Sequence, residues 1–76
     1  MKAHSSIEPL AVSALRQSPI SALHSLEVTE HEEAIILTGK VGSYYFKQLA
    51  QEAIVSVVGD REIVNNIRVF KHRQPV

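Results

Sequence analysis

Apolar residues recur with a helical period in two stretches of the chain. In the first, about residues 7–17, they lie three or four positions apart and form one stripe of Ile7, Leu10, Ala11, Ala14 and Leu15. Ser5 or Ser6 can cap this helix, Pro9 is tolerated in its first turn, and Ser18-Pro19 ends it. The pattern predicts a short amphipathic helix.

The second helical stretch begins at Ser43, a good N-cap residue, and ends at Gly59. We expect its apolar face to comprise Phe46, Leu49, Ala50, Ala53 and Val57. Lys47, Gln48, Gln51 and Glu52 would lie on the opposite face.

Three other segments have patterns that are typical of strands. Residues 24–29 and 62–70 alternate between apolar and polar positions, and residues 34–41 are rich in β-branched side chains. The polar residues 30–33 would connect the first two strands in a hairpin, although they lack the favoured Asn-Gly turn.

The order helix-strand-strand-helix-strand predicts an α+β fold. We expect a two-layer sandwich, in which two helices cover one face of a three-stranded sheet. The buried sheet face would carry Leu26, Val28, Ile35, Leu37, Val41, Ile63, Ile67 and Val69. The open face would carry Glu27, Thr29, Ile36, Thr38, Val64, Asn66, Arg68 and Phe70.

Length and composition restrict the class of protein. A chain of 76 residues forms a single domain, with a core at about residues 7–70 and a frayed tail at 71–76. The absence of cysteine excludes disulfides, thiolate metal sites and a cysteine nucleophile. No secretory signal or membrane-spanning run is visible, so we expect either a cytoplasmic protein, at most peripheral at a membrane, or a piece of a longer chain.

Two runs of the sequence carry a family pattern. The first is Ile35-x-Leu37-Thr38-Gly39-x-Val41, and the second is Gly59-x-x-x-Ile63-x-Asn65-x-Ile67-x-Val69. With this spacing the chain resembles a BON domain, the bacterial osmotic-stress and nodulation module, over about residues 7–69, and it looks like a small stand-alone variant. The resemblance implies a non-catalytic binding module that attaches to phospholipid membranes.

Three residues in or beside these runs have physical explanations. Gly39 indicates a close approach of neighbouring backbone or helix. Asn65 is a polar residue on an apolar strand face, so it needs hydrogen-bond partners, most simply backbone groups of a neighbouring loop. Asp60 stands where the family has valine, which removes an apolar contact between the second helix and the last strand.

Charge is unevenly distributed along the chain. Residues 1–39 hold two basic and five acidic groups, whereas residues 40–76 hold six basic and three acidic groups. The basic half and the start of the second helix suggest a lipid- or anion-binding surface. Its candidate residues are Lys40, Tyr44, Tyr45, Lys47, Arg68, Lys71 and Arg73.

A second hypothesis is a protein interface. Ile36, Val64 and Phe70 are apolar residues on the open sheet face, and a contiguous patch there would mark a contact with a protein partner or a second copy in a homodimer. The uneven charge would also let two copies pair acidic end to basic end.

Other functions have weaker sequence support. Gly39-Lys40-Val41-Gly42 matches the Gly-x-x-Gly of KH RNA-binding domains, but the balanced net charge argues against nucleic acid as a partner. His31 among Glu30, Glu32 and Glu33 could form a metal site, yet a solvated turn explains these residues better. No catalytic motif is present, so we expect no enzymatic activity, no cofactor and no metal.

Overall fold

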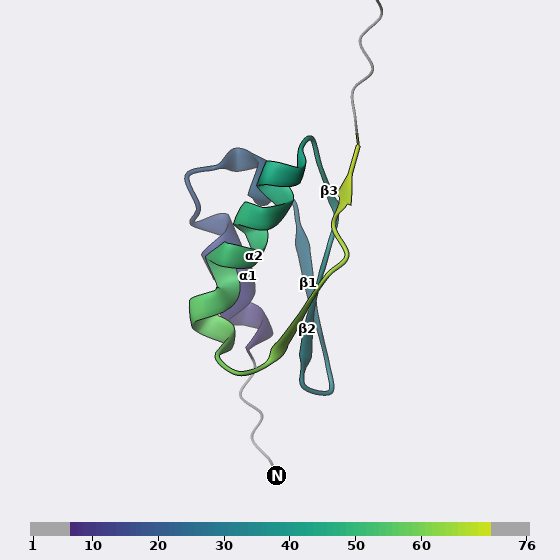
Figure 1. Ribbon diagram of the computed structural model, residues 1–76. Coiled ribbons are helices and arrows are strands. Elements are labelled where there is room, and N and C mark those ends of the chain that lie inside the picture. The colour runs from purple at the N-terminus through teal and green to yellow at the C-terminus, as the bar shows by residue number, and fades with distance from the viewer. Residues whose placement is uncertain (1–6, 71–76) are drawn as a thin grey trace, which may run out of the picture.

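A computed structural model describes residues 7–70 as two packed layers (Figure 1). The helices are α1 (Glu8–Arg16), a 3₁₀ turn η1 (Ser21–Leu23) and α2 (Tyr44–Val58). The strands are β1 (Glu27–His31), β2 (Ala34–Thr38), β3 (Lys40–Val41), β4 (Glu62–Asn65) and β5 (Arg68–Val69). Both helices cover the same face of the sheet, which confirms the α+β sandwich.

The strands form one mixed layer. β2 lies between β1, its antiparallel partner, and β4, which runs parallel to it, so the order is β1-β2-β4. β3 and β5 form a separate parallel pair. Ala34 pairs with Glu62 and Lys40 pairs with Arg68, so both parallel pairs share one register. The predicted strands 34–41 and 62–70 are therefore each interrupted once, and the two breaks lie beside each other in the sheet.

Gly39 causes the interruption. Its φ is +134°, and a Cβ there would lie 2.6 Å from Leu26 Cδ2. Only glycine fits this conformation and this contact at low cost. The ladder nevertheless continues, because Arg68 N–H donates to Gly39 O at 2.8 Å and Phe70 N–H donates to Val41 O at 3.0 Å. The close approach expected at Gly39 is confirmed, with Leu26 as the neighbour.

The first strand differs from its predicted range. It runs over Glu27–His31 instead of 24–29, and it pairs along its whole length with β2. The polar residues Glu30 and His31 extend the strand because pairing with Ile35 and Ala34 satisfies their backbone groups. Residues before Glu27 instead form η1, which buries Leu23 and which the sequence pattern did not predict.

Helix α1 buries a narrower stripe than expected. Ala11 and Leu15 are fully buried, but Leu10 is 54% exposed, so its assignment to the core stripe was wrong. The stripe is centred on Ala11 and Leu15, which leaves Leu10 outside it and brings Val12 against the core. Ser5 and Ser6 lie outside the described residues. Glu8 N–H donates to the Glu30 carboxylate at 3.3 Å, so a strand residue satisfies one free donor of the first turn.

Helix α2 begins and ends as predicted but is rotated about its axis. Ser43 Oγ accepts from Phe46 N–H at 3.2 Å, and Gly59 ends the helix with φ +63°. The fully buried residues are Ala50, Ile54 and Val58. The buried stripe therefore turns towards Lys47 and Gln51, which the sequence placed on the solvent face and which are half-buried.

The core lies between the helices and the sheet. Its buried apolar residues are Ala11, Leu15, Leu23, Leu26, Val28, Ile35, Leu37, Val41, Ala50, Ile54, Val58 and Ile67. Six of the eight sheet residues expected in the core belong to this set, and Ile63 and Val69 pack against it half-buried. Within residues 7–70, the helices lack the length and the continuous apolar surface that a membrane span requires.

Candidate functional site

The two ends of the sheet differ in charge. At one end β2 passes through β3 into α2, and β5 lies beside β3 (Figure 1). At the other end lie the β1–β2 turn and the connection from α2 to β4. The first end carries Lys40 and Arg68, together with Glu27, which pairs with Thr38, and the second carries Glu32, Glu33, Asp60 and Glu62.

A depression of about 410 Å³ marks what we call the basic end, which is lined by Lys40, Arg68, Val69 and Phe70. Lys40 and Arg68 are direct partners in the β3–β5 ladder, so two cationic side chains start from adjacent backbone positions. Both are exposed, and Phe70 beside them is 49% exposed. Like charges placed opposite each other on a sheet repel, so the arrangement favours an anionic ligand.

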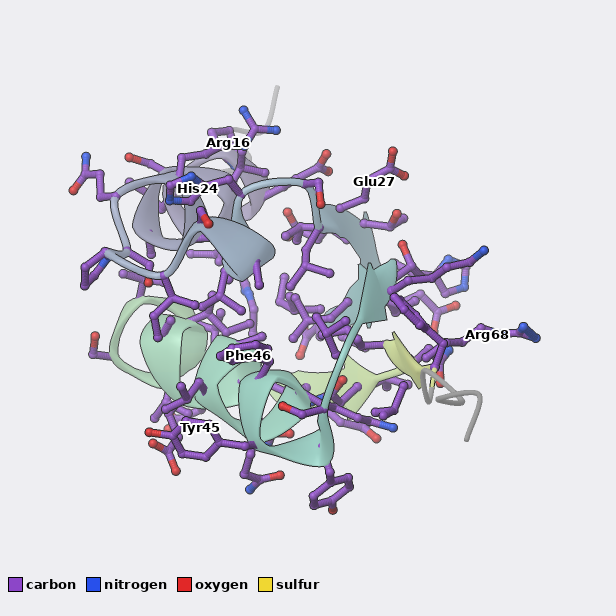
Figure 2. All side chains as sticks on the ribbon, turned by 90° about the horizontal axis from the view of Figure 1, so that it is seen from above. Arg16, His24, Glu27, Tyr45, Phe46 and Arg68 are labelled. Atoms are coloured by element: carbon purple, nitrogen blue, oxygen red, sulfur yellow. The ribbon has the colours of Figure 1, made fainter. Side chains whose placement is uncertain are left out.

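The aromatic residues at the start of α2 are arranged differently. Tyr44 and Tyr45 are each 66% exposed. Seen from above, Tyr45 projects from the helix side and Arg68 from the sheet side (Figure 2). Tyr45 packs its ring against Phe46, with ring centroids 5.9 Å apart. Tyr45 therefore lies at the end of the sheet where α2 begins, but it projects from the helix side and away from Arg68.

The remaining candidates of the lipid hypothesis divide into two groups. Lys47 is half-buried on α2, and its backbone carbonyl accepts a hydrogen bond from the Asn65 side chain at 3.1 Å. Lys71 and Arg73 lie outside the described residues. Within residues 7–70, Lys40 and Arg68 are the candidate cations that the fold places side by side.

The apolar candidates of the interface hypothesis also separate. Ile36 and Val64 are register partners on β2 and β4, and both are half-buried on the face opposite the helices. Phe70 lies six residues beyond Val64, beside Lys40 and Arg68. The open face thus has a small apolar centre at Ile36 and Val64, and Phe70 belongs to the basic end.

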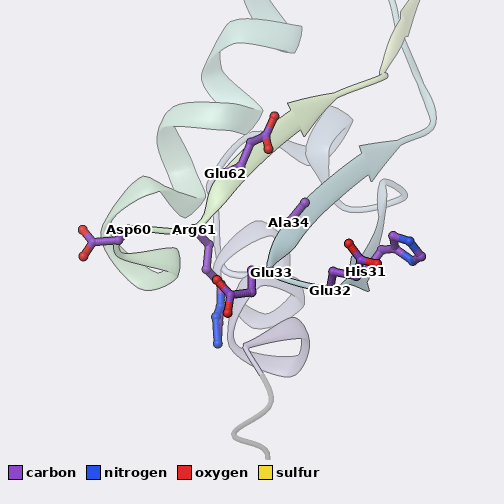
Figure 3. Close-up of a pocket in the computed structure, with 7 residues that line it drawn as sticks. All are labelled: His31, Glu32, Glu33, Ala34, Asp60, Arg61 and Glu62. Carbon is purple, nitrogen blue, oxygen red and sulfur yellow. The ribbon is translucent and has the colours of Figure 1, made fainter.

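A second depression, of about 520 Å³, marks what we call the acidic end (Figure 3). Its charged lining comprises Glu32, Glu33, Asp60, Arg61 and Glu62, with His31 beside them. Sequence reasoning did not identify this surface. The charge run Glu32-Glu33 was visible, but only the parallel pairing of β2 with β4 brings it to Asp60 and Glu62.

Asp60 is exposed at this end, so its carboxylate faces water and is not a buried polar group. The neighbouring Arg61 differs, because its Nε is buried and has no hydrogen-bond partner among the residues that the structure describes.

The histidines and the Gly-x-x-Gly run have structural explanations. His24 Nε2 lies 2.7 Å from Ser18 O, which ties η1 to the end of α1. In the part of the chain that the structure describes, no three histidine, aspartate or glutamate residues are grouped closely enough to hold a metal ion. Lys40 and Val41 of the Gly-x-x-Gly run form β3, so this run is not the loop between two helices that a KH domain uses.

Comparison with known proteins identifies a family. The BON domain family model matches residues 10–70 of the 76-residue chain. No curated protein and no solved structure gives a match. The family match spans most of the chain and includes both ends of the sheet. The chain therefore belongs to the BON domain family.

Proposed function

We propose that this BON domain attaches to anionic phospholipid surfaces through its basic end. BON domains are non-catalytic binding modules and are often associated with phospholipid. The observation that supports the proposal is the pairing of Lys40 with Arg68 beside the exposed ring of Phe70. Two cations and one apolar side chain at the same end match the headgroup and acyl layers of a membrane surface.

Binding through this end is expected to be weak and sensitive to salt. Each basic side chain near an anionic surface contributes about 1 kcal/mol, and this contribution falls within a Debye length. Two such charges and one partly inserted ring support reversible attachment only. A membrane partner that presents many headgroups suits this geometry better than a single soluble anion.

Flotation with lipid vesicles tests the proposal. We expect the protein to float with vesicles that contain about 30% phosphatidylglycerol, and to remain behind with phosphatidylcholine alone. Raising the NaCl concentration from about 20 mM to about 500 mM should abolish flotation.

A matched pair of arginine variants locates the surface. Arg68→Gln should lower the fraction bound about five-fold, because it removes one charge from the basic end. Arg16→Gln removes the same charge from the end of α1, in the helix layer and away from Arg68, and should change binding less than about two-fold (Figure 2). Equal losses in the two variants, or no flotation with anionic vesicles at low salt, would contradict the proposal.

A further inference from the structure

The open face of the sheet has a charge pattern that is complementary to itself. Glu32, in the β1–β2 turn, lies four residues before Ile36 of β2, and Lys40 of β3 lies four residues after it. Along β4 and β5, Glu62 precedes Val64 and Arg68 follows it, all three on the same face by strand alternation. An apolar centre is thus flanked by acidic groups at one end and basic groups at the other.

From this pattern we propose that two copies of the chain associate through their open sheet faces as an antiparallel, two-fold symmetric dimer. This inference does not rest on the proposed membrane binding. Within residues 7–70 both helices lie on the opposite face of the sheet, so no described element covers the centre at Ile36 and Val64 (Figure 1).

Charge decides between the two ways of stacking two such faces. If the two-fold axis ran along the strands, the basic end of one copy would lie over the basic end of the other and repel it. With the axis perpendicular to the strands, Ile36 and Val64 of each copy meet their symmetry mates. Lys40 then lies over Glu32 of the second copy, and Arg68 lies over its Asp60–Glu62 segment.

The charged side chains at the two ends can reach each other in this arrangement. The acidic end is hollowed by a depression of about 520 Å³ that carries four carboxylates and one arginine (Figure 3). The lysine and arginine of the basic end are exposed, and both have long side chains that can reach the carboxylates of a second copy. The pattern is isologous, because each copy supplies one acidic and one basic end to the interface.

The area of the open sheet face sets the expected affinity of the dimer. Three strands about 4.8 Å apart and roughly eight residues long present a face on the order of 400 Å². A standard stable interface uses about 800 Å² per partner, so the dimer should be weak and depend on electrostatic attraction. We expect a dissociation constant between about 10 μM and about 1 mM at low salt.

Sedimentation equilibrium across this concentration range provides the test. The unmodified chain should sediment as a dimer at about 1 mM protein and low salt, and mostly as a monomer at about 500 mM NaCl. Val64→Lys should weaken dimerisation at least ten-fold, whereas Ser56→Lys, at an exposed position on α2, should not. A monomer at every concentration, or a dimer unaffected by Val64→Lys, would overturn the proposal.

Charge reversal tests the electrostatic pairing on which the arrangement depends, without touching the core. The Lys40→Glu/Arg68→Glu variant and the Glu32→Lys/Glu62→Lys variant alter exposed residues only, and circular dichroism should show that both fold. Each variant alone should remain monomeric, and an equimolar mixture should form a heterodimer. Failure of the mixture to associate, or self-association of either variant, would refute the arrangement.

Vesicles separate this inference from the proposed function. The Glu32→Lys/Glu62→Lys variant keeps the basic end, so it should lose dimerisation yet float with anionic vesicles at least as well as the unmodified chain. Dimerisation without flotation would reject only the membrane proposal. Flotation without dimerisation would reject only the dimer.

Discussion

Asn65 on β4 is hydrogen-bonded to the backbone of Lys47 on α2. Its Nδ2 donates to Lys47 O at 3.1 Å and to Gln51 Oε1 at 3.2 Å, and its Oδ1 accepts from Ile67 N–H at 3.3 Å. One amide therefore joins the helix to the sheet and satisfies a donor at the break between β4 and β5. Because α2 starts beside β3, this link also positions the basic end.

Replacing Asn65 should destabilise the domain. Asn65→Ala removes three hydrogen bonds at a half-buried site, and we expect it to lower the free energy of unfolding by about 1–3 kcal/mol. Asn65→Asp keeps the acceptor but sets a negative charge against two oxygens, so its cost should be at least as large. Urea denaturation measures both.

The neighbouring Asn66 provides the control for this prediction. It is exposed, and Asn66→Ala should change stability by no more than about 0.5 kcal/mol. Equal effects at Asn65 and Asn66 would show that the link to α2 contributes nothing to stability.

Two glycines three residues apart should respond differently to alanine. Gly39→Ala forces a Cβ to 2.6 Å from Leu26 Cδ2 in a backbone with φ +134°, so we expect a loss of about 2–4 kcal/mol. At Gly42 a Cβ would meet no atom within 4 Å and φ is not positive, so Gly42→Ala should be close to neutral. Thermal unfolding of both variants tests this contrast, and similar melting temperatures would contradict it.

The β1–β2 turn offers a stabilising substitution. Glu32 has φ +57°, while Glu33 follows it in a two-residue connection between His31 and Ala34. A residue with a Cβ is strained at this positive φ, and the strain costs the folded state more free energy than the extra chain entropy that glycine gives the unfolded state. Glu32→Gly should therefore stabilise the domain by about 0.5–1 kcal/mol and raise Tm by about 3–6 °C.

The second turn position serves as the matched control. Glu33 does not have a positive φ, so Glu33→Gly relieves no strain in the folded state. It should lower Tm slightly, because glycine increases the conformational entropy of the unfolded chain. A rise in Tm for Glu33→Gly but not for Glu32→Gly would contradict the structure of this turn.

Phe70 should contribute to membrane binding in proportion to its exposed ring. Phe70→Ser should reduce partitioning into anionic vesicles about five-fold, since insertion of a half-exposed ring is worth about 1 kcal/mol. Leu10 is similarly exposed, at 54% against 49%, but it lies on α1 away from the basic end. Leu10→Ser should therefore leave partitioning unchanged, and a comparable loss there would argue against the basic end as the membrane contact.

Local patterns predicted most of the fold. The period of the strand positions placed Ile35 and Leu37 correctly in the core, and Ser43 and Gly59 marked the ends of α2. These features depend on a residue and its near neighbours in sequence. Leu10 and the buried stripe of α2 were misplaced, because the rotation of a helix is set by what packs against it.

The candidate surfaces were less accessible to sequence reasoning. Lys40 and Arg68 could be named as cations, but their adjacency depends on a parallel pairing between segments 28 residues apart. The acidic end depends on the same register, through the pairing of Ala34 with Glu62. Composition and residue spacing do not indicate which strands are neighbours in the sheet.

By itself, the sequence determined the element order, the buried face of the sheet, the close approach at Gly39, the end of the second helix at Gly59, and the family. Each of these follows from local backbone preference, from the period of apolar residues or from the spacing of the two family runs. Only the tertiary structure decided the strand order β1-β2-β4, the break at Gly39 and the opposite charges of the two ends. These features depend on contacts between segments that are far apart in the sequence, and such contacts form only in the folded chain.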